Sequence, residues 1–88
     1  MANHIKGDEV QIEDLGDGIR RQIMGYTDNL MLVKVYFKKG SVGYIHSHVH
    51  DQITYVDSGK FEITIDNEIK ILTSGDSCVV KSGVEHGA

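Results

Sequence analysis

The chain has 88 residues and a formal net charge of −4, with one cysteine, ten glycines and no proline. This length allows one small domain over residues 1–88, and a lone cysteine excludes a disulfide framework. The negative charge argues against nonspecific nucleic-acid binding, which needs a basic surface. No apolar run reaches the roughly 20 residues of a membrane-spanning helix, and no signal peptide is visible. We therefore expect a cytoplasmic protein that binds neither membranes nor nucleic acid.

The first predicted element lies in the acidic stretch from residue 7 to residue 17. Val10 and Ile12 alternate there with polar residues, which predicts a first strand with one solvated face. Gly16 and Gly18 flank Asp17, and this combination is typical of a turn. The stretch is therefore predicted to end a strand and start a hairpin.

Two longer strands are predicted next. Residues 19–26 predict a second strand with Arg20 and Arg21 on opposite faces, because side chains alternate along an extended chain. Residues 30–38 form the most continuous apolar run of the sequence, interrupted by Lys34. This composition predicts a strand that is buried on both faces.

The C-terminal half consists of short strand-like runs separated by turn residues. Asp66 and Asn67 tolerate positive φ and predict a tight hairpin. The predicted strands around and beside this hairpin are residues 52–56, 60–65, 68–72 and 77–80. About eight short strands over the whole chain predict an all-β sandwich or barrel.

Histidines are concentrated in two segments. His46, His48 and His50 alternate in one segment, and His86 lies near the C-terminus. In a strand, His46 and His48 would share one face about 7 Å apart, so both imidazoles could bind one ion. A histidine here could also be a polar turn residue, but an alternating pair together with a histidine far away in the sequence favours a metal site.

The glycines and histidines match two motifs of the cupin family. The first motif, with the spacing G-x5-H-x-H-x3-E-x6-G, fits Gly40, His46, His48, Gln52 and Gly59, with Gln where Glu is usual. The second fits Gly75, Gly83 and His86, with Lys81 where Pro is usual. The sequence thus resembles a cupin, which implies a jelly-roll β-barrel. The resemblance implies one divalent transition metal (Ni, Zn, Fe, Mn or Cu) held by His46, His48, Gln52 and His86. A site with three histidines, in which Gln52 only forms hydrogen bonds in the pocket, is the alternative.

Within the cupins, residues 46–56, the upstream run 28–35 and the end of the chain resemble the pectin-degradation group of small cupins. This resemblance implies an enzyme that linearises 4,5-unsaturated monouronates from pectin or alginate, so the expected partner is a small anionic sugar acid. His50 is a candidate proton carrier in the pocket. Arg20 or Lys34 is a candidate for neutralising an anionic group of the substrate.

Members of that group continue beyond the His-Gly pair near the end of this chain. The resemblance therefore implies a barrel that lacks its last strand or strands, and an open strand edge is expected to pair in a homodimer. Two other functions remain open at this point. One is a cupin dioxygenase, against which the neutral Gln52 counts. The other is a non-catalytic module that binds sugar acids.

Overall fold

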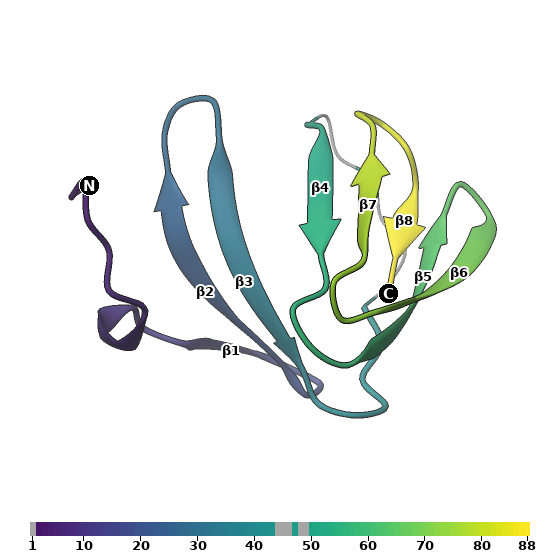
Figure 1. Ribbon diagram of the computed structural model, residues 1–88, viewed down its shortest axis with the longest axis horizontal. Helices are drawn as coiled ribbons and strands as arrows, with labels where there is room; N and C mark the ends of the chain where they lie inside the picture. Colours follow the sequence, from purple (N-terminus) through teal and green to yellow (C-terminus); the bar gives the residue numbers. More distant parts are fainter. Residues whose placement is uncertain (1, 44–46, 48–49) are drawn as a thin grey trace. The chain divides into compact units, whose positions relative to one another are not determined.

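The computed structural model describes residues 2–43, 47 and 50–88, and nearly all of its regular structure is β-strand (Figure 1). A short 3-10 helix, η1 (Gly7–Glu9), precedes the strands β1 (Glu13–Gly16), β2 (Ile19–Tyr26), β3 (Met31–Phe37), β4 (Gln52–Tyr55), β5 (Lys60–Ile65), β6 (Glu68–Thr73), β7 (Ser77–Val80) and β8 (His86–Gly87). Every pairing among these strands is antiparallel. The predicted all-β class is confirmed, and the described residues form eight strands.

Contacts within the chain separate two compact units, an N-terminal unit (Met1–Ser41) and a C-terminal unit (Val42–Ala88). The N-terminal unit is one sheet in the order β1-β2-β3. Its first turn is confirmed where the sequence predicted one, with positive φ at Gly16 (83°), Asp17 (53°) and Gly18 (80°). The second strand also has its predicted bounds. The single domain over residues 1–88 stays a prediction.

The strand predicted around Val10 and Ile12 is wrong. The chain instead forms η1 and then an irregular segment, and pairing begins only at Glu13. The side chain of Gln22 explains the difference, because its Nε2 donates to the carbonyls of Gly7 and Val10 at 3.0 Å each. These carbonyls are therefore bound by a side-chain amide and not by a neighbouring strand.

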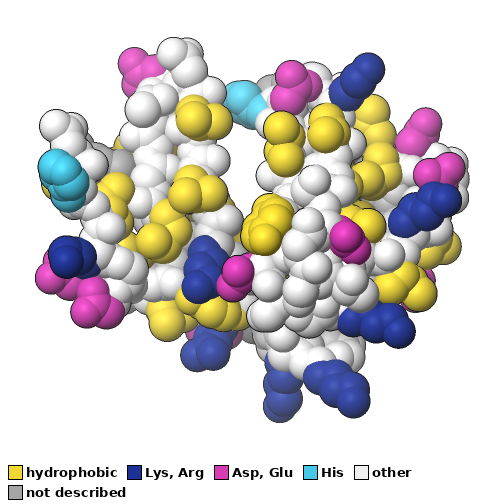
Figure 2. All heavy atoms as spheres, in the orientation of Figure 1, with side chains coloured by type: hydrophobic (Ala, Val, Ile, Leu, Met, Phe, Trp, Pro, Cys, Tyr) yellow, Lys and Arg dark blue, Asp and Glu magenta, His cyan; other side chains and the backbone are white. Residues whose placement is uncertain are grey.

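Burial of β3 on both faces is also wrong. Met31, Leu32 and Val35 are 57%, 66% and 45% exposed. All three strands of the N-terminal unit lie in one sheet, so no second sheet of that unit covers either face of β3. Figure 2 shows hydrophobic side chains at the surface of this sheet. A continuous apolar run predicted the strand correctly but could not predict what covers it.

The C-terminal unit contains two small sheets, the pair β4-β7 and the sheet β6-β5-β8. Its buried aliphatic residues are Val56, Ile63 and Val80, which are 4%, 8% and 2% exposed. The predicted hairpin between β5 and β6 is confirmed, with φ of 48° at Asp66 and 67° at Asn67. Two positive φ values in a two-residue loop match the right-handed twist of the flanking strands.

Among the described residues there is no helix with the length and apolar character to cross a membrane. The regular structure of this part of the chain consists of strands and the three residues of η1.

Candidate metal site

The predicted metal ligands are divided between two segments of the C-terminal unit. His46 and His48 lie outside the described residues, so their side chains are not placed. Gln52 and His86 are described, and each begins a strand, β4 and β8 respectively. Within the described residues, no three His, Cys, Asp or Glu side chains gather closely enough to hold a metal. The described features of the candidate site are therefore Gln52, His86 and the hydrogen bonds between the two segments.

Gln52 presents its amide in a defined orientation. It pairs with Val80 of β7 and is half-buried. Its Nε2 donates to Thr54 Oγ1 at 2.9 Å, and the two side chains share a face because they are two residues apart in a strand. This bond uses one of the two N–H groups of the amide, and Oε1 is the amide atom that can act as a metal ligand. The orientation is compatible both with Oε1 as a metal ligand and with the second N–H as a hydrogen-bond donor to a substrate.

His86 is 5% exposed and pairs with Ile65 of β5. Its Nδ1 lies 3.0 Å from the carbonyl oxygen of Val84. A carbonyl can only accept, so Nδ1 carries the proton and donates, and in the neutral ring the lone pair is then on Nε2. Metal-binding histidines commonly donate their second nitrogen to a carbonyl in this way. The tautomer of His86 therefore fits an Nε2 metal ligand.

Hydrogen bonds tie the two motif segments together at both ends. The backbones of Gly43 and Ala88 exchange a pair of bonds, at 2.8 Å from the Gly43 N–H and 3.3 Å from the Ala88 N–H. At the other end the Ser82 N–H donates to Asp51 Oδ1 at 2.8 Å. Gly43 and Asp51 flank the histidine-rich segment, while Ser82 and Ala88 flank His86. The structure thus brings together the residues that flank the two segments predicted to share a site.

The C-terminal motif has the backbone that its glycines predict. Gly75 and Gly83 have φ of 92° and 81°, which an L side chain rarely adopts. Val84 donates its N–H to the Lys81 carbonyl at 3.1 Å, closing a tight turn around Gly83. This turn directs the chain into β8 and places His86 at its first residue. Lys81 stands at the usual proline position without disturbing the turn.

The two candidate catalytic residues have different surroundings. His50 is exposed, just before β4. Arg20 belongs to the N-terminal unit, where its guanidinium carbon lies 5.9 Å from the centroid of the Tyr36 ring. Lys34, the alternative to Arg20, belongs to the same unit, while the predicted metal ligands belong to the C-terminal unit. The catalytic roles of both residues stay predictions.

Sequence reasoning missed Asp51 and Thr54. Asp51 binds a backbone N–H that is 31 residues away, and such a bond leaves no local pattern. Thr54 could have been found, because a hydroxyl two residues after Gln52 on the same face of a strand is within reach of its amide. Thr54 contacts the side chain of Gln52, and Asp51 binds the backbone of the segment that leads to His86.

Comparison with known proteins identifies the family. The family model for the cupin domain matches residues 33–88, and the chain therefore belongs to the cupin family. Over 88 residues it is 44% identical to the pectin degradation protein KdgF of Dickeya dadantii (strain 3937), covering 99% of this chain and 80% of that protein. The predicted family and its pectin-degradation group are confirmed.

Two solved structures are similar throughout this chain. An RmlC-like cupin from Shewanella frigidimarina NCIMB 400 has a TM-score of 0.93 and 45% identity, covering 98% of this chain and 78% of its own. KdgF from Halomonas sp. has a TM-score of 0.93 and 38% identity, covering 99% of this chain and 80% of its own. These matches confirm the cupin fold class.

Proposed function

We propose that this cupin is a metal-dependent enzyme that opens the ring of 4,5-unsaturated monouronates derived from pectin or alginate. The observation that carries the proposal is the pairing of the two motif segments through Gly43–Ala88 and Asp51–Ser82. It supports a site to which both segments contribute side chains. The similarity to a protein named for pectin degradation supports the substrate class.

The metal would be held by His46, His48, Gln52 and His86. Imidazole nitrogens suit Ni, Zn, Fe and Cu, and an amide oxygen also suits Mn, so the donor set is compatible with each of the predicted ions. Three imidazoles and one amide are neutral, so they cancel none of the charge of a divalent ion. When bound, such an ion supplies a Lewis acid that attracts the carboxylate of a uronate.

The proposed reaction is an isomerisation without oxidation or reduction. The hydroxyl on C1 of the cyclic sugar loses its proton, and the bond between C1 and the ring oxygen breaks. C1 becomes an aldehyde, and the ring oxygen becomes the enol oxygen on C5. The enol then loses its proton while C4 gains one, which gives the open-chain ketone. All atoms of the substrate are retained, so the protein needs only to move protons and to hold the carboxylate.

His50 is the proposed proton carrier. Its exposed position lets an imidazole exchange protons with water between turnovers. Arg20 is the proposed cation for an anionic group of the sugar, since a guanidinium binds carboxylates with two parallel hydrogen bonds. The homodimer and the cytoplasmic location are further parts of the proposal. Analytical ultracentrifugation and cell fractionation test these two points separately.

An ultraviolet assay tests the proposed reaction. The unsaturated uronate absorbs because its C4–C5 double bond is conjugated with the carboxylate, and ring opening followed by ketonisation removes this conjugation. We expect the metal-loaded protein to abolish the absorbance, His86→Ala to lose this activity and His4→Ala to keep it. His4 is an exposed histidine outside both motifs, so it controls for the loss of any imidazole.

An unchanged absorbance with fully metal-loaded parent protein would contradict the enzymatic proposal. If the same preparation still binds the uronate, the non-catalytic sugar-acid module predicted as an alternative replaces it. If oxygen is consumed instead, the dioxygenase replaces it. The three outcomes are distinguished by absorbance, calorimetry and an oxygen electrode on one sample.

A further inference from the structure

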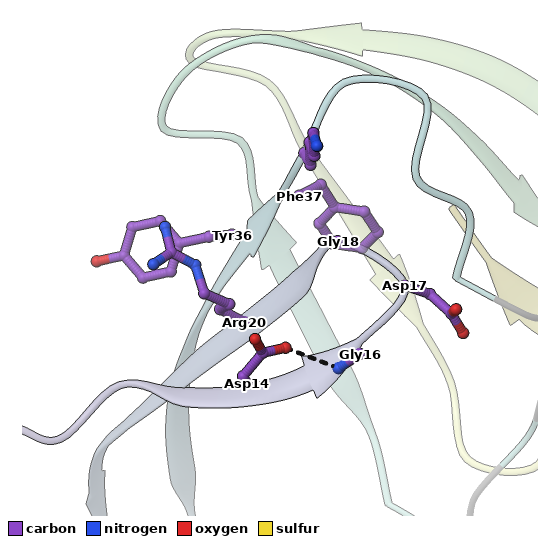
Figure 3. Close-up of a pocket in the computed structure, with 8 residues that line it drawn as sticks. Asp14, Gly16, Asp17, Gly18, Arg20, Tyr36 and Phe37 are labelled. Atoms are coloured by element: carbon purple, nitrogen blue, oxygen red, sulfur yellow. Dashed lines mark hydrogen bonds between the residues drawn. The ribbon is translucent and has the colours of Figure 1, made fainter.

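The N-terminal unit contains a cavity of about 560 Å³ whose lining includes none of the proposed metal ligands. It lies at the β1–β2 turn and extends along the neighbouring ends of β2 and β3 (Figure 3). Charged and aromatic side chains line it together with turn glycines: Asp14, Gly16, Asp17, Gly18, Arg20, Tyr36, Phe37 and Lys38. Its volume is within the range of small-molecule sites.

A chain of hydrogen bonds fixes the aromatic wall of this cavity. Tyr36 donates its hydroxyl to Gln22 Oε1 at 2.6 Å, and Gln22 is 5% exposed. The amide nitrogen of Gln22 is itself bound to the carbonyls of Gly7 and Val10. The Tyr36 ring is therefore held in place before any ligand arrives, which lowers the entropy lost on binding.

The cations beside this ring have no carboxylate partner within the described residues. Arg20 and Lys34 are placed near the Tyr36 ring, at 5.9 Å and 5.1 Å from its centroid. The described residues contain one ion pair, between Arg21 and Glu13 at 3.1 Å, on the other face of the sheet. Arg20 and Arg21 are thus neighbours in sequence that lie on opposite faces of the sheet. Arg21 is ion-paired with Glu13, whereas Arg20 lines the cavity and forms no ion pair within the described residues.

The same cavity also offers oxygen acceptors. Asp14 lies opposite Arg20 in the strand register and accepts the Gly16 N–H at 2.8 Å through Oδ1. Asp17, in the turn, contributes a second carboxylate. Carboxylates accept hydrogen bonds from hydroxyls, and a carboxylate has several acceptor positions. Cations and carboxylates in one cavity suit a ligand that carries both an anionic group and hydroxyl donors.

We propose that this cavity is a binding site for an acidic sugar, in which Arg20 and Lys38 hold the carboxylate and Asp14 and Asp17 accept hydroxyl hydrogens. The sugar class rests in part on the proposed function, because a uronate-processing protein meets such ligands. The cavity uses residues 14–38, and none of these is a proposed metal ligand. Binding at the cavity therefore does not require a metal.

Nuclear magnetic resonance of the full chain, kept free of metal with a chelator, tests the proposal. Galacturonate is titrated in while the backbone amides of Gly16 and Gly18 are followed, because both line the cavity. We expect saturable shifts of these two signals with galacturonate and none with galactose, which lacks the carboxylate. Arg20→Ala should weaken binding about tenfold or more, whereas Arg21→Ala, the matched control, should leave it unchanged.

Three results would each overturn this proposal. The first is no shift of either glycine signal with galacturonate. The second is an equal loss of galacturonate affinity in Arg20→Ala and Arg21→Ala. The third is an equal shift of the glycine signals with inorganic phosphate, which would indicate an anion site without sugar recognition. The ultraviolet assay on metal-loaded protein is independent of these results. If galacturonate shifts the glycine signals but the protein does not open the ring, only the proposed function is contradicted. If the protein opens the ring but galacturonate shifts neither signal, only the proposed binding site in the cavity is contradicted.

Discussion

The interiors of the two units contain different kinds of residue. In the described part of the N-terminal unit the buried residue is polar, Gln22, and it connects β2 to Tyr36 and to the segment that contains η1. Among the described residues of the C-terminal unit, the buried ones are Val56, Ile63, Val80 and His86. A polar centre is sensitive to hydrogen-bonding groups, whereas an aliphatic centre is sensitive to volume. The predicted metal-binding segments belong to the unit with the aliphatic centre.

Replacing the polar centre should have the largest effect on stability. Gln22→Leu keeps a side chain of similar size but removes three hydrogen bonds, to Tyr36, Gly7 and Val10. Because buried acceptors and a hydroxyl then lose their partner, we expect the free energy of unfolding to fall by about 3 kcal/mol. Urea denaturation measures this, and Gln11→Leu at an exposed position is the control. No loss of stability would mean that the N-terminal unit does not depend on its buried amide.

The aliphatic centre can be tested with two adjacent valines. Val80 is 2% exposed and Val79 is 59% exposed, on opposite faces of β7. We expect Val80→Ala to lower the free energy of unfolding by about 2 kcal/mol, because it leaves a cavity in the core. Val79→Ala should change it by less than about 0.5 kcal/mol. Equal effects in urea denaturation would refute the assignment of Val80 to the core.

The β1–β2 turn offers a comparison of two glycines with nearly the same backbone. Gly16 and Gly18 have φ of 83° and 80°. A Cβ on Gly16 would meet nothing within 4 Å, while one on Gly18 would lie 2.9 Å from the Lys38 Cβ. Alanine is strained at both positions, but only at position 18 does it also clash. We expect Gly18→Ala to cost about 1.5 kcal/mol more than Gly16→Ala in thermal denaturation, and equal costs would show that the strand end yields freely.

The smallest predicted effect concerns the ligand face of β4. Thr54→Val removes the hydroxyl that binds the Gln52 amide but keeps the shape of the side chain. We expect metal affinity to fall about tenfold, because the amide oxygen is then no longer held in one orientation. Thr54→Ser, which restores a hydroxyl, should recover most of this affinity. Competition with a coloured chelator gives both values, and an affinity unaffected in Thr54→Val would favour the three-histidine site.

Local patterns predicted the elements well. The sequence predicted β2 with its observed bounds, and the Asp66-Asn67 pair predicted the hairpin because those residues tolerate the φ that such a turn requires. The segment near Val10 failed because a distant amide, Gln22, binds its backbone. The exposure of β3 could not be predicted because coverage depends on how layers assemble, and a strand's own composition does not determine that.

The candidate site also has features that the sequence predicted and features that it could not predict. Motif spacing predicted that the segments around His48 and His86 belong to one site, and hydrogen bonds between their flanking residues agree with this expectation. The bond from Ser82 to Asp51 could not be predicted, since it joins residues 31 positions apart. Arg20 was predicted from its charge alone. The surroundings that distinguish it from Arg21 are visible only once the strands are paired.

The central claim is that the two motif segments together hold one metal ion. Elemental analysis of protein purified without a nickel column tests it directly, with parent, His48→Ala, His86→Ala and His4→Ala measured side by side. We predict about one metal ion per chain in the parent and in His4→Ala, and loss of the metal in both motif variants. A parent that neither contains nor takes up metal would contradict the claim. Full retention of metal in His48→Ala or His86→Ala would contradict it as well.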